Sequence, residues 1–221
     1  MVAINFQNNE IVIDLVYFGP PSSGKKTWIR YIHEHSAEAG QLDEHTFGEK
    51  TLRFQRPVFE RIKIGERSYD LSFNFVALSY EFENTNPTPE TLRNADGIVF
   101  IADSSPRMTE QNIRYRDCMK QLLNDSGIEL TDGKAELEAS AYYQPEAPSK
   151  KIAAIKVPWV LACNKRDLTG CRPLSDLEND LKIDDVPVFE CIATEGSGVY
   201  GTFKSLEHRV MAGLSKLHLV E

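Results

Sequence analysis

The sequence predicts an α/β protein with a doubly wound, mostly parallel sheet of about six strands and helices on both faces. Two observations lead to this fold class. Short, nearly continuous apolar runs, typical of strands buried on both faces, alternate along the chain with segments whose apolar residues recur at a helical period. Parallel neighbours in a sheet need crossover connections, and the intervening helices supply them.

The composition is that of one globular domain. The chain has 221 residues, of which 41% are hydrophobic and 26% charged, so a core can form and global disorder is excluded. The net charge of −8 argues against a surface that binds nucleic acid or anionic lipid. No apolar run is long enough to span a membrane, and there is no signal peptide, prenylation box or myristoylation site. We expect a single domain over residues 1–221, in the cytoplasm and without a direct membrane anchor.

The first part of the chain predicts four regular elements. Residues 11–18 form an apolar run rich in β-branched and aromatic side chains, which predicts a buried strand that ends at a Gly-Pro-Pro sequence. Residues 25–35 repeat apolar side chains at a helical period and predict a helix. Residues 58–64 and 68–76 predict two antiparallel strands, because Gly65-Glu66 between them suits a hairpin turn.

The alternation resumes after a cluster of Asn and Pro at residues 84–89. Residues 97–102 form the clearest central strand. The remaining elements expected are helices at residues 108–123, 174–181 and 203–214, and strands at residues 157–164 and 186–192.

Residues 125–156 break this rhythm. They mix acidic residues, tyrosines, prolines and lysines without a clean period, so we expect a surface insertion with at most one short helix. Tyr142-Tyr143 and Lys150-Lys151 in it could form a partner patch, although solvated loop residues are the favoured interpretation.

The loop after the first strand carries the clearest chemical signal. Residues 19–25 read GPPSSGK and fit the first seven positions of a phosphate-binding loop in the required strand-loop-helix context. Glycines let the backbone wrap around phosphate oxygens, backbone N–H groups and the helix N-terminus attract the anion, and Lys25 would reach the β- and γ-phosphates. The alternative is a chance match in an ordinary connection. We favour phosphate binding, with candidate residues Gly19, Ser22, Ser23, Gly24, Lys25, Lys26 and Thr27.

A second motif follows the strand at residues 157–164. Residues 164–167 read NKRD and fit N-K-x-D. The carboxylate of Asp167 could accept two hydrogen bonds from the N1–H and 2-amino groups of guanine, a pair of donors that adenine lacks. The stem of Lys165 could lie over the base, and Asn164 could tie neighbouring loops together. An isolated tetrapeptide of this kind is more often a solvated loop.

In order and on one edge of the sheet, the two motifs resemble those of the Ras-like small GTPases, most closely the bacterial MglA-like group. The likeness rests on residues 11–27, 96–103, 164–168 and 193–199, and it covers nearly the whole chain except residues 125–156. It implies a P-loop, Ras-like G domain that binds GTP or GDP. It also implies that the backbone around Ala193 and Thr194 offers an N–H group to guanine, for which the alternative is a Gly-rich turn before the last helix.

The chain departs from this family at the metal ligand. The phosphate-binding loop normally continues with Ser or Thr, whose hydroxyl binds Mg²⁺ between the β- and γ-phosphates. Lys26 stands there, and Thr27 comes one residue late and points about 100° away on a helix. A protonated lysine cannot bind a metal, but it can supply one positive charge near the phosphates. Mg²⁺ is therefore a cofactor only if another group replaces this ligand, and we expect no metal site built from the chain's own residues.

The second phosphate-sensing motif is also missing. An ungapped comparison places Ala77 where the family has Asp or Thr, Tyr80 where it has Gly, and Glu81 where many relatives have the catalytic glutamine. Tyr80 is expected to obstruct the γ-phosphate, and for Glu81 an ordinary exposed glutamate is favoured over a general base. Thr51, after Lys50, is either the family's switch threonine or a plain threonine before a strand.

The lost positions concern Mg²⁺ and the γ-phosphate, whereas the base-reading residues are kept. We therefore expect a guanine-nucleotide-binding regulator with weak or absent, Mg²⁺-sparing hydrolysis, which is a pseudo-GTPase. The resemblance implies a Roadblock-type or effector partner and a role in polarity or motility signalling. Two alternatives stay open: a genuine GTPase whose partner supplies the missing groups, and a scaffold that holds no nucleotide. The question of whether the chain is an enzyme therefore stays open too.

Overall fold

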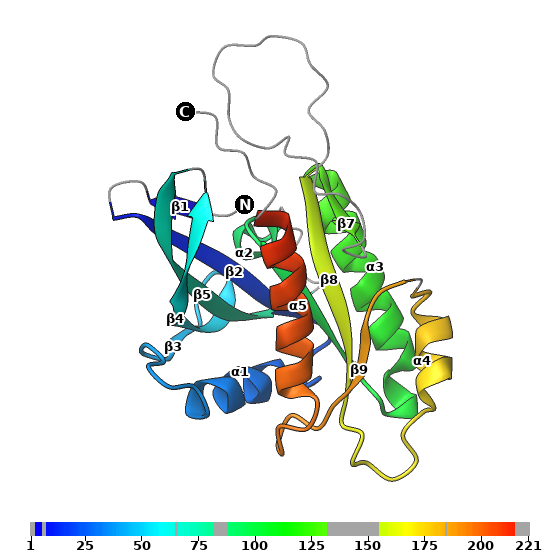
Figure 1. Ribbon diagram of the computed structural model, residues 1–221. Coiled ribbons are helices and arrows are strands. Elements are labelled where there is room, and N and C mark those ends of the chain that lie inside the picture. Colours follow the sequence, from blue (N-terminus) through cyan, green and yellow to red (C-terminus); the bar gives the residue numbers. More distant parts are fainter. Residues whose placement is uncertain are drawn as a thin grey trace.

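The computed structural model describes residues 3–5, 8–64, 66–81, 88–131, 155–183 and 185–214. These residues form a nine-stranded sheet with helices on both faces (Figure 1). The strands are β1 (Ala3–Asn5), β2 (Glu10–Phe18), β3 (Asp43–His45), β4 (Lys50–Ile64), β5 (Arg67–Ser79), β6 (Gly97–Asp103), β7 (Ile128–Thr131), β8 (Ile155–Asn164) and β9 (Val188–Glu190). The helices are α1 (Lys25–Glu34), α2 (Glu90–Arg93), the 3₁₀ turn η1 (Pro106–Met108), α3 (Thr109–Asp125), α4 (Leu174–Asp180) and α5 (Val199–Leu214).

The sheet is mostly parallel, in the order β3-β4-β5-β2-β6-β8-β7, with β1 paired to β2 and β9 to β8. Strands β2, β5, β6, β7, β8 and β9 run parallel, whereas β1, β3 and β4 pair antiparallel with their neighbours. The predicted fold class is confirmed, but the expected number of about six strands is wrong. The register sets Phe18 beside Phe100 and Asp103 beside Asn164, so the carboxyl ends of β2, β6 and β8 meet at one edge.

Helices α1 and α5 cover one face of the sheet (Figure 1). Trp28 and Ile29 from α1 and Phe203 from α5 are buried against alternate residues of β2, β5 and β6. Phe75 of β5 stacks on Phe54 of β4, with ring centroids 4.9 Å apart, and packs against Phe203 at 5.2 Å. This layer fixes where α1 begins, and therefore where the loop before it lies.

Helices α2, α3 and α4 cover the opposite face. Tyr115 and Met119 from α3 and Leu177 from α4 are buried against Phe18, Phe100 and other residues that point to this side of β2, β6 and β8. The two cores are thus separated by the sheet, as a doubly wound fold requires.

Several boundaries differ from the predicted ones. The strand expected at 58–64 begins at Lys50 and continues through Pro57, and the hairpin partner extends to Ser79. Helix α5 begins four residues earlier than expected, at Val199, and β9 is only three residues long. The expected insertion begins with β7, a strand that pairs with β8, and residues 132–154 lie outside the described part of the chain. Strands β1 and β3 and helix α2 are additional elements.

Candidate functional site

The loop between β2 and α1 is held by left-handed backbone at three positions. Gly19 has φ +147°, and a Cβ atom there would lie 2.2 Å from the carbonyl oxygen of Ile101. Gly24 has φ +103°, and a Cβ atom there would lie 2.3 Å from Nδ2 of Asn164. Ser22 also adopts a positive φ, of 60°. The backbone therefore turns tightly between β6 and the end of β8, which is the shape that turns successive N–H groups toward an anion.

Lys25 lies inside this loop. Its side chain is 5% exposed, and its ammonium donates hydrogen bonds of 2.7 Å to the carbonyl oxygens of Gly19 and Pro20. Burial, and then the neighbouring charge of Lys26, lower the pKa of Lys25 to about 7. The buried ammonium of Lys25 thus lies next to the curved backbone. An anion bound there would offset the free-energy cost of burying this charge.

Lys26, one residue further, turns to the surface and pairs with β3. Its Nζ lies 2.5 Å from Oε1 of Glu44, and Nη2 of Arg30 lies 3.5 Å from the other carboxylate oxygen. A hydrogen bond and the charge of Lys26 hold the pKa of Glu44 below its usual range. A positively charged side chain therefore stands at the chain position where the phosphate-binding loop normally has a hydroxyl, and its ammonium group points to Glu44 at the surface.

A pocket of about 440 Å³ joins this loop to the ends of β4 and β5. Lys50 and Glu81 face it as an ion pair of 2.9 Å. Its lining residues are Pro21, Ser22, Gly24, Lys25, Lys26 and Thr27 on one side, and Lys50, Ser79, Tyr80 and Glu81 on the other. Glu81 thus lies beside the phosphate-binding candidates. Thr51 is buried on β4 and is not among the lining residues.

Tyr80 forms part of the pocket wall rather than an exposed loop. Its ring packs against Phe18 at a centroid distance of 6.1 Å, and its carbonyl oxygen accepts a hydrogen bond of 2.9 Å from the hydroxyl of Tyr115. Burial raises the pKa of Tyr80. A glycine at this position would leave space that the tyrosine fills.

Asn164 connects the loop before α1 with the loop after β9. Its amide nitrogen donates to the carbonyl oxygen of Ser23 at 2.8 Å, and its amide oxygen accepts from the backbone N–H of Ala193 at 2.9 Å. The side chain is 2% exposed, so both hydrogen bonds are shielded from water. The sequence placed these three segments in one site, and Asn164 brings them together.

Lys165 is anchored by a residue that lies outside the two motifs. Its ammonium lies 2.6 Å from Oδ2 of Asp103, while the other carboxylate oxygen accepts hydrogen bonds from the backbone N–H and hydroxyl of Ser105. Burial alone would raise the pKa of Asp103, but the hydrogen bonds from Lys165 and Ser105 hold that pKa below its usual value. The signal available in the sequence was a carboxylate at the end of the central strand, adjacent in the sheet to the strand that carries Asn164.

The residues around Asp167 and Thr194 present their side chains to solvent. Both are exposed, and the side chain of Asp167 has no hydrogen-bond partner within the described chain. Arg166 steadies this loop, since its guanidinium pairs with Glu190 at 2.7 Å and donates to the carbonyl oxygen of Arg172. The arrangement leaves a carboxylate free to accept hydrogen bonds from a ligand.

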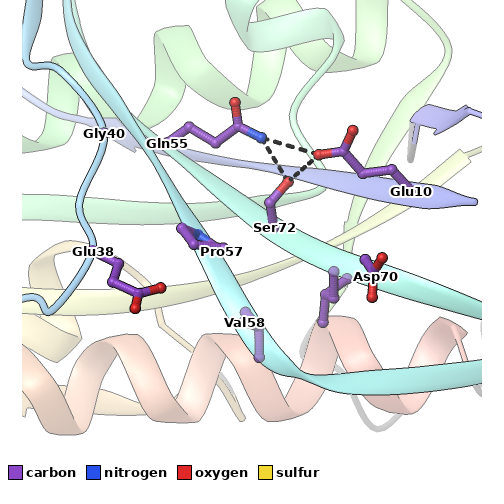
Figure 2. A pocket seen from close by; sticks show the side chains of 9 residues that line it. Glu10, Glu38, Gly40, Gln55, Pro57, Val58, Asp70 and Ser72 are labelled. Atoms are coloured by element: carbon purple, nitrogen blue, oxygen red, sulfur yellow. Dashed lines mark hydrogen bonds between the residues drawn. The ribbon is translucent and has the colours of Figure 1, made fainter. Parts of the chain in front are cut away.

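A second pocket, of about 520 Å³, lies near the opposite end of β2 (Figure 2). Gln55 donates to Ser72 at 2.7 Å and to Glu10 at 3.3 Å, and Ser72 donates to Glu10 at 3.2 Å. Figure 2 shows these three side chains converging, with Glu38 and Asp70 nearby. These hydrogen bonds link Gln55, Ser72 and Glu10 to one another, and none of the predicted site residues lies here.

Two further findings concern metals and membranes. Within the described residues, no group of three or more His, Cys, Asp and Glu side chains is arranged to hold a metal ion. No described helix combines the length and apolar character needed to cross a bilayer.

A known protein is similar to this chain over nearly its whole length. No protein-family model matches the chain. The mutual gliding-motility protein MglA of Myxococcus xanthus (strain DK1622) is 26% identical over 220 residues, which cover 98% of this chain and 99% of that protein. This similarity, together with the mixed α/β fold, supports a relationship to the MglA-like small GTPases.

Proposed function

We propose that this chain, as a single domain, is a guanine-nucleotide-binding regulator whose hydrolysis is weak or absent and depends little on Mg²⁺. The observation that carries the proposal is the junction at Asn164. One buried amide bonds to Ser23 in the phosphate-binding loop and to Ala193 in the loop expected to contact the base. These hydrogen bonds would hold the proposed phosphate site and the proposed base site at a fixed separation.

Guanine is the base that the free carboxylate favours. Asp167 is exposed at the end of β8, and two charge-assisted hydrogen bonds to one base edge would be worth about 1.5–3 kcal/mol each. Adenine offers no matching pair of donors. The stem of Lys165, anchored at Asp103, is the group proposed to cover the face of the base.

Metal independence rests on Lys26. Its ammonium, which pairs with Glu44 beside the pocket, adds positive charge to this region, and of the residues that line the pocket only Glu81 carries a carboxylate, which is already paired with Lys50. The residues that line the pocket therefore do not fit a bound Mg²⁺. Tyr80 and Glu81 replace the glycine and glutamine that the family uses for hydrolysis, which supports slow or absent turnover.

Partner binding and biological role follow from the relative. MglA of Myxococcus xanthus is named for gliding motility, and we extend to this chain a role in motility or polarity signalling through a Roadblock-type or effector protein. The cytoplasm is the compartment in which such a regulator would act.

The decisive experiment is calorimetric titration of the purified full chain. GDP, a non-hydrolysable GTP analogue and ADP are compared in Mg²⁺ and in EDTA. We expect guanine nucleotides to bind in both buffers and ADP in neither. An Asp167→Asn variant should lose GDP affinity and gain affinity for xanthosine diphosphate, because an amide can donate to the 2-oxo group of xanthine. Equal affinity for GDP and ADP would refute guanine recognition, and no binding in either buffer would favour the scaffold.

Lys26→Thr tests the metal argument in the same assay. Restoring a hydroxyl is expected to make GTP-analogue affinity depend on Mg²⁺, so that EDTA weakens binding about tenfold or more. Lys63→Thr is the matched control, since it makes the same change at an exposed residue of β4 that does not line this pocket. A wild-type chain that already loses its nucleotide in EDTA would contradict the proposal.

A further inference from the structure

The carboxylate of Glu44 lies against the two cations on the exposed side of α1. Lys26 is 2.5 Å away and Arg30, one helical turn later, is 3.5 Å away. The side chains of Lys26 and Glu44 are 38% and 39% exposed. An anion of the chain itself therefore neutralises the lysine that follows the phosphate-binding loop.

Lys26 faces two anion positions at once. It lines the pocket of about 440 Å³ together with Lys25 and Lys50, and it also reaches out to β3. A nucleotide phosphate in that pocket and the carboxylate of Glu44 would both be attracted to one ammonium group. The contact to Glu44 therefore lowers the positive charge that the pocket can offer.

Strand β3 is a short strand at an edge of the sheet. It has three residues, all exposed, and within the described part of the chain it pairs with residues 51–53 at the start of β4 alone. On its outer side it is an edge of the sheet. The ion pair to α1 is thus a main attachment of β3 to the phosphate-binding segment.

We propose that Glu44 is an internal competitor for the terminal phosphate of a guanosine triphosphate, and that it biases this pocket toward the diphosphate. The inference rests on the function proposed above and names its regulation. Loop N–H groups and Lys25 are available to the phosphates of either nucleotide, whereas the third phosphate adds negative charge near position 26, the position whose hydroxyl in phosphate-binding loops holds Mg²⁺ between the β- and γ-phosphates. Binding of a triphosphate draws Lys26 from Glu44 and releases β3.

The test compares Glu44→Gln with wild type in EDTA, using GDP and a non-hydrolysable GTP analogue. The variant should bind the GTP analogue about two- to fivefold more tightly, the range expected for one exposed ion pair, and GDP with unchanged affinity. Asp43→Asn is the matched control, because it removes the same charge from the adjacent residue of β3, and it should change neither affinity. An unchanged or lower ratio of GTP-analogue to GDP affinity in Glu44→Gln, or the same change in Asp43→Asn, would overturn the proposal.

Two further readouts separate this inference from guanine binding itself. Inorganic tripolyphosphate and pyrophosphate probe the same competition without a base, and Glu44→Gln should favour tripolyphosphate selectively. If the chain shows no selectivity for guanine but Glu44→Gln does favour tripolyphosphate, the competition between Glu44 and phosphate is supported and the proposal of guanine-nucleotide binding is refuted. In wild type, hydrogen exchange at residues 43–53 should rise with the GTP analogue and not with GDP, and protection by both ligands would contradict the release of β3.

Discussion

At the residue level, the titration of Lys25 should make the affinity for GDP depend on pH. Burial lowers its pKa to about 7, so in the free protein the side chain is increasingly neutral above that pH. Phosphate favours the ammonium form and raises the pKa again, so binding above pH 7 takes up a proton. Affinity for GDP should fall as the pH rises from about 7 to 9, by up to about tenfold per unit.

Calorimetry in buffers of different ionisation enthalpy measures this proton uptake directly. Lys25→Met is the control: it should bind GDP poorly and show no uptake. Affinity that stays constant over this pH range would show that Lys25 is already charged in the free protein.

Asp103 is a positioning residue for Lys165. Replacing it with Asn removes the charge that anchors the ammonium at 2.6 Å while keeping the volume of the side chain. We expect GDP affinity to fall about tenfold, because a charge-assisted contact is lost. In a Lys165→Met background the same replacement should have little further effect. Additive losses in the double variant would mean that Asp103 acts independently of Lys165.

Sequence predicts some of the site residues but not the contacts between them. The identities of Lys25, Asn164 and Asp167 follow from motifs whose spacing is local, so sequence predicts them. The pairing of Lys26 with Glu44, and of Lys165 with Asp103, joins residues 18 and 62 positions apart. Such pairs depend on how strands are ordered in the sheet, and a single sequence does not specify that order.

Among the elements, the turn into α1 leaves no space for added volume. Gly24→Ala places a Cβ atom 2.3 Å from Nδ2 of Asn164 at a φ of +103°, and it should lower the free energy of unfolding by about 2–4 kcal/mol and abolish GDP binding. Gly48→Ala is the control, since Gly48 also has positive φ but no atom within 4 Å. It should cost about 1 kcal/mol. Urea denaturation compares the two, and equal losses would show that backbone strain alone matters.

Strands with continuous apolar runs were predicted, and strands made of polar residues were not. Strand β6 is buried along its whole length and its pattern is unmistakable, whereas β3 reads Asp-Glu-His and is wholly exposed. The first half of β4 was missed because it carries basic residues and Pro57, which usually interrupts a strand. Here the strand lies toward the edge of the sheet, where a proline is tolerated.

For the molecule as a whole, stability resides in two cores separated by the sheet. Phe75 is fully buried in the core beneath α1 and α5, between Phe54 and Phe203. Phe75→Ala should lower the free energy of unfolding by about 3–5 kcal/mol. Phe47→Ala, at a side chain 93% exposed, should change it by less than about 0.5 kcal/mol. Denaturant melts of both variants test this, and a comparable loss in Phe47→Ala would mean that its ring packs in solution.

The two hydrogen bonds of Asn164 also make the site sensitive to deamidation of this side chain during storage. A primary amide is the only side chain of this size that donates at one end and accepts at the other, and Asn164 uses both ends. Slow hydrolysis of that amide to aspartate, a common form of chemical ageing, would turn a carboxylate oxygen toward the carbonyl of Ser23 without changing the size of the side chain. A preparation that has aged in this way would keep its fold and lose the connection between its two ligand-binding loops.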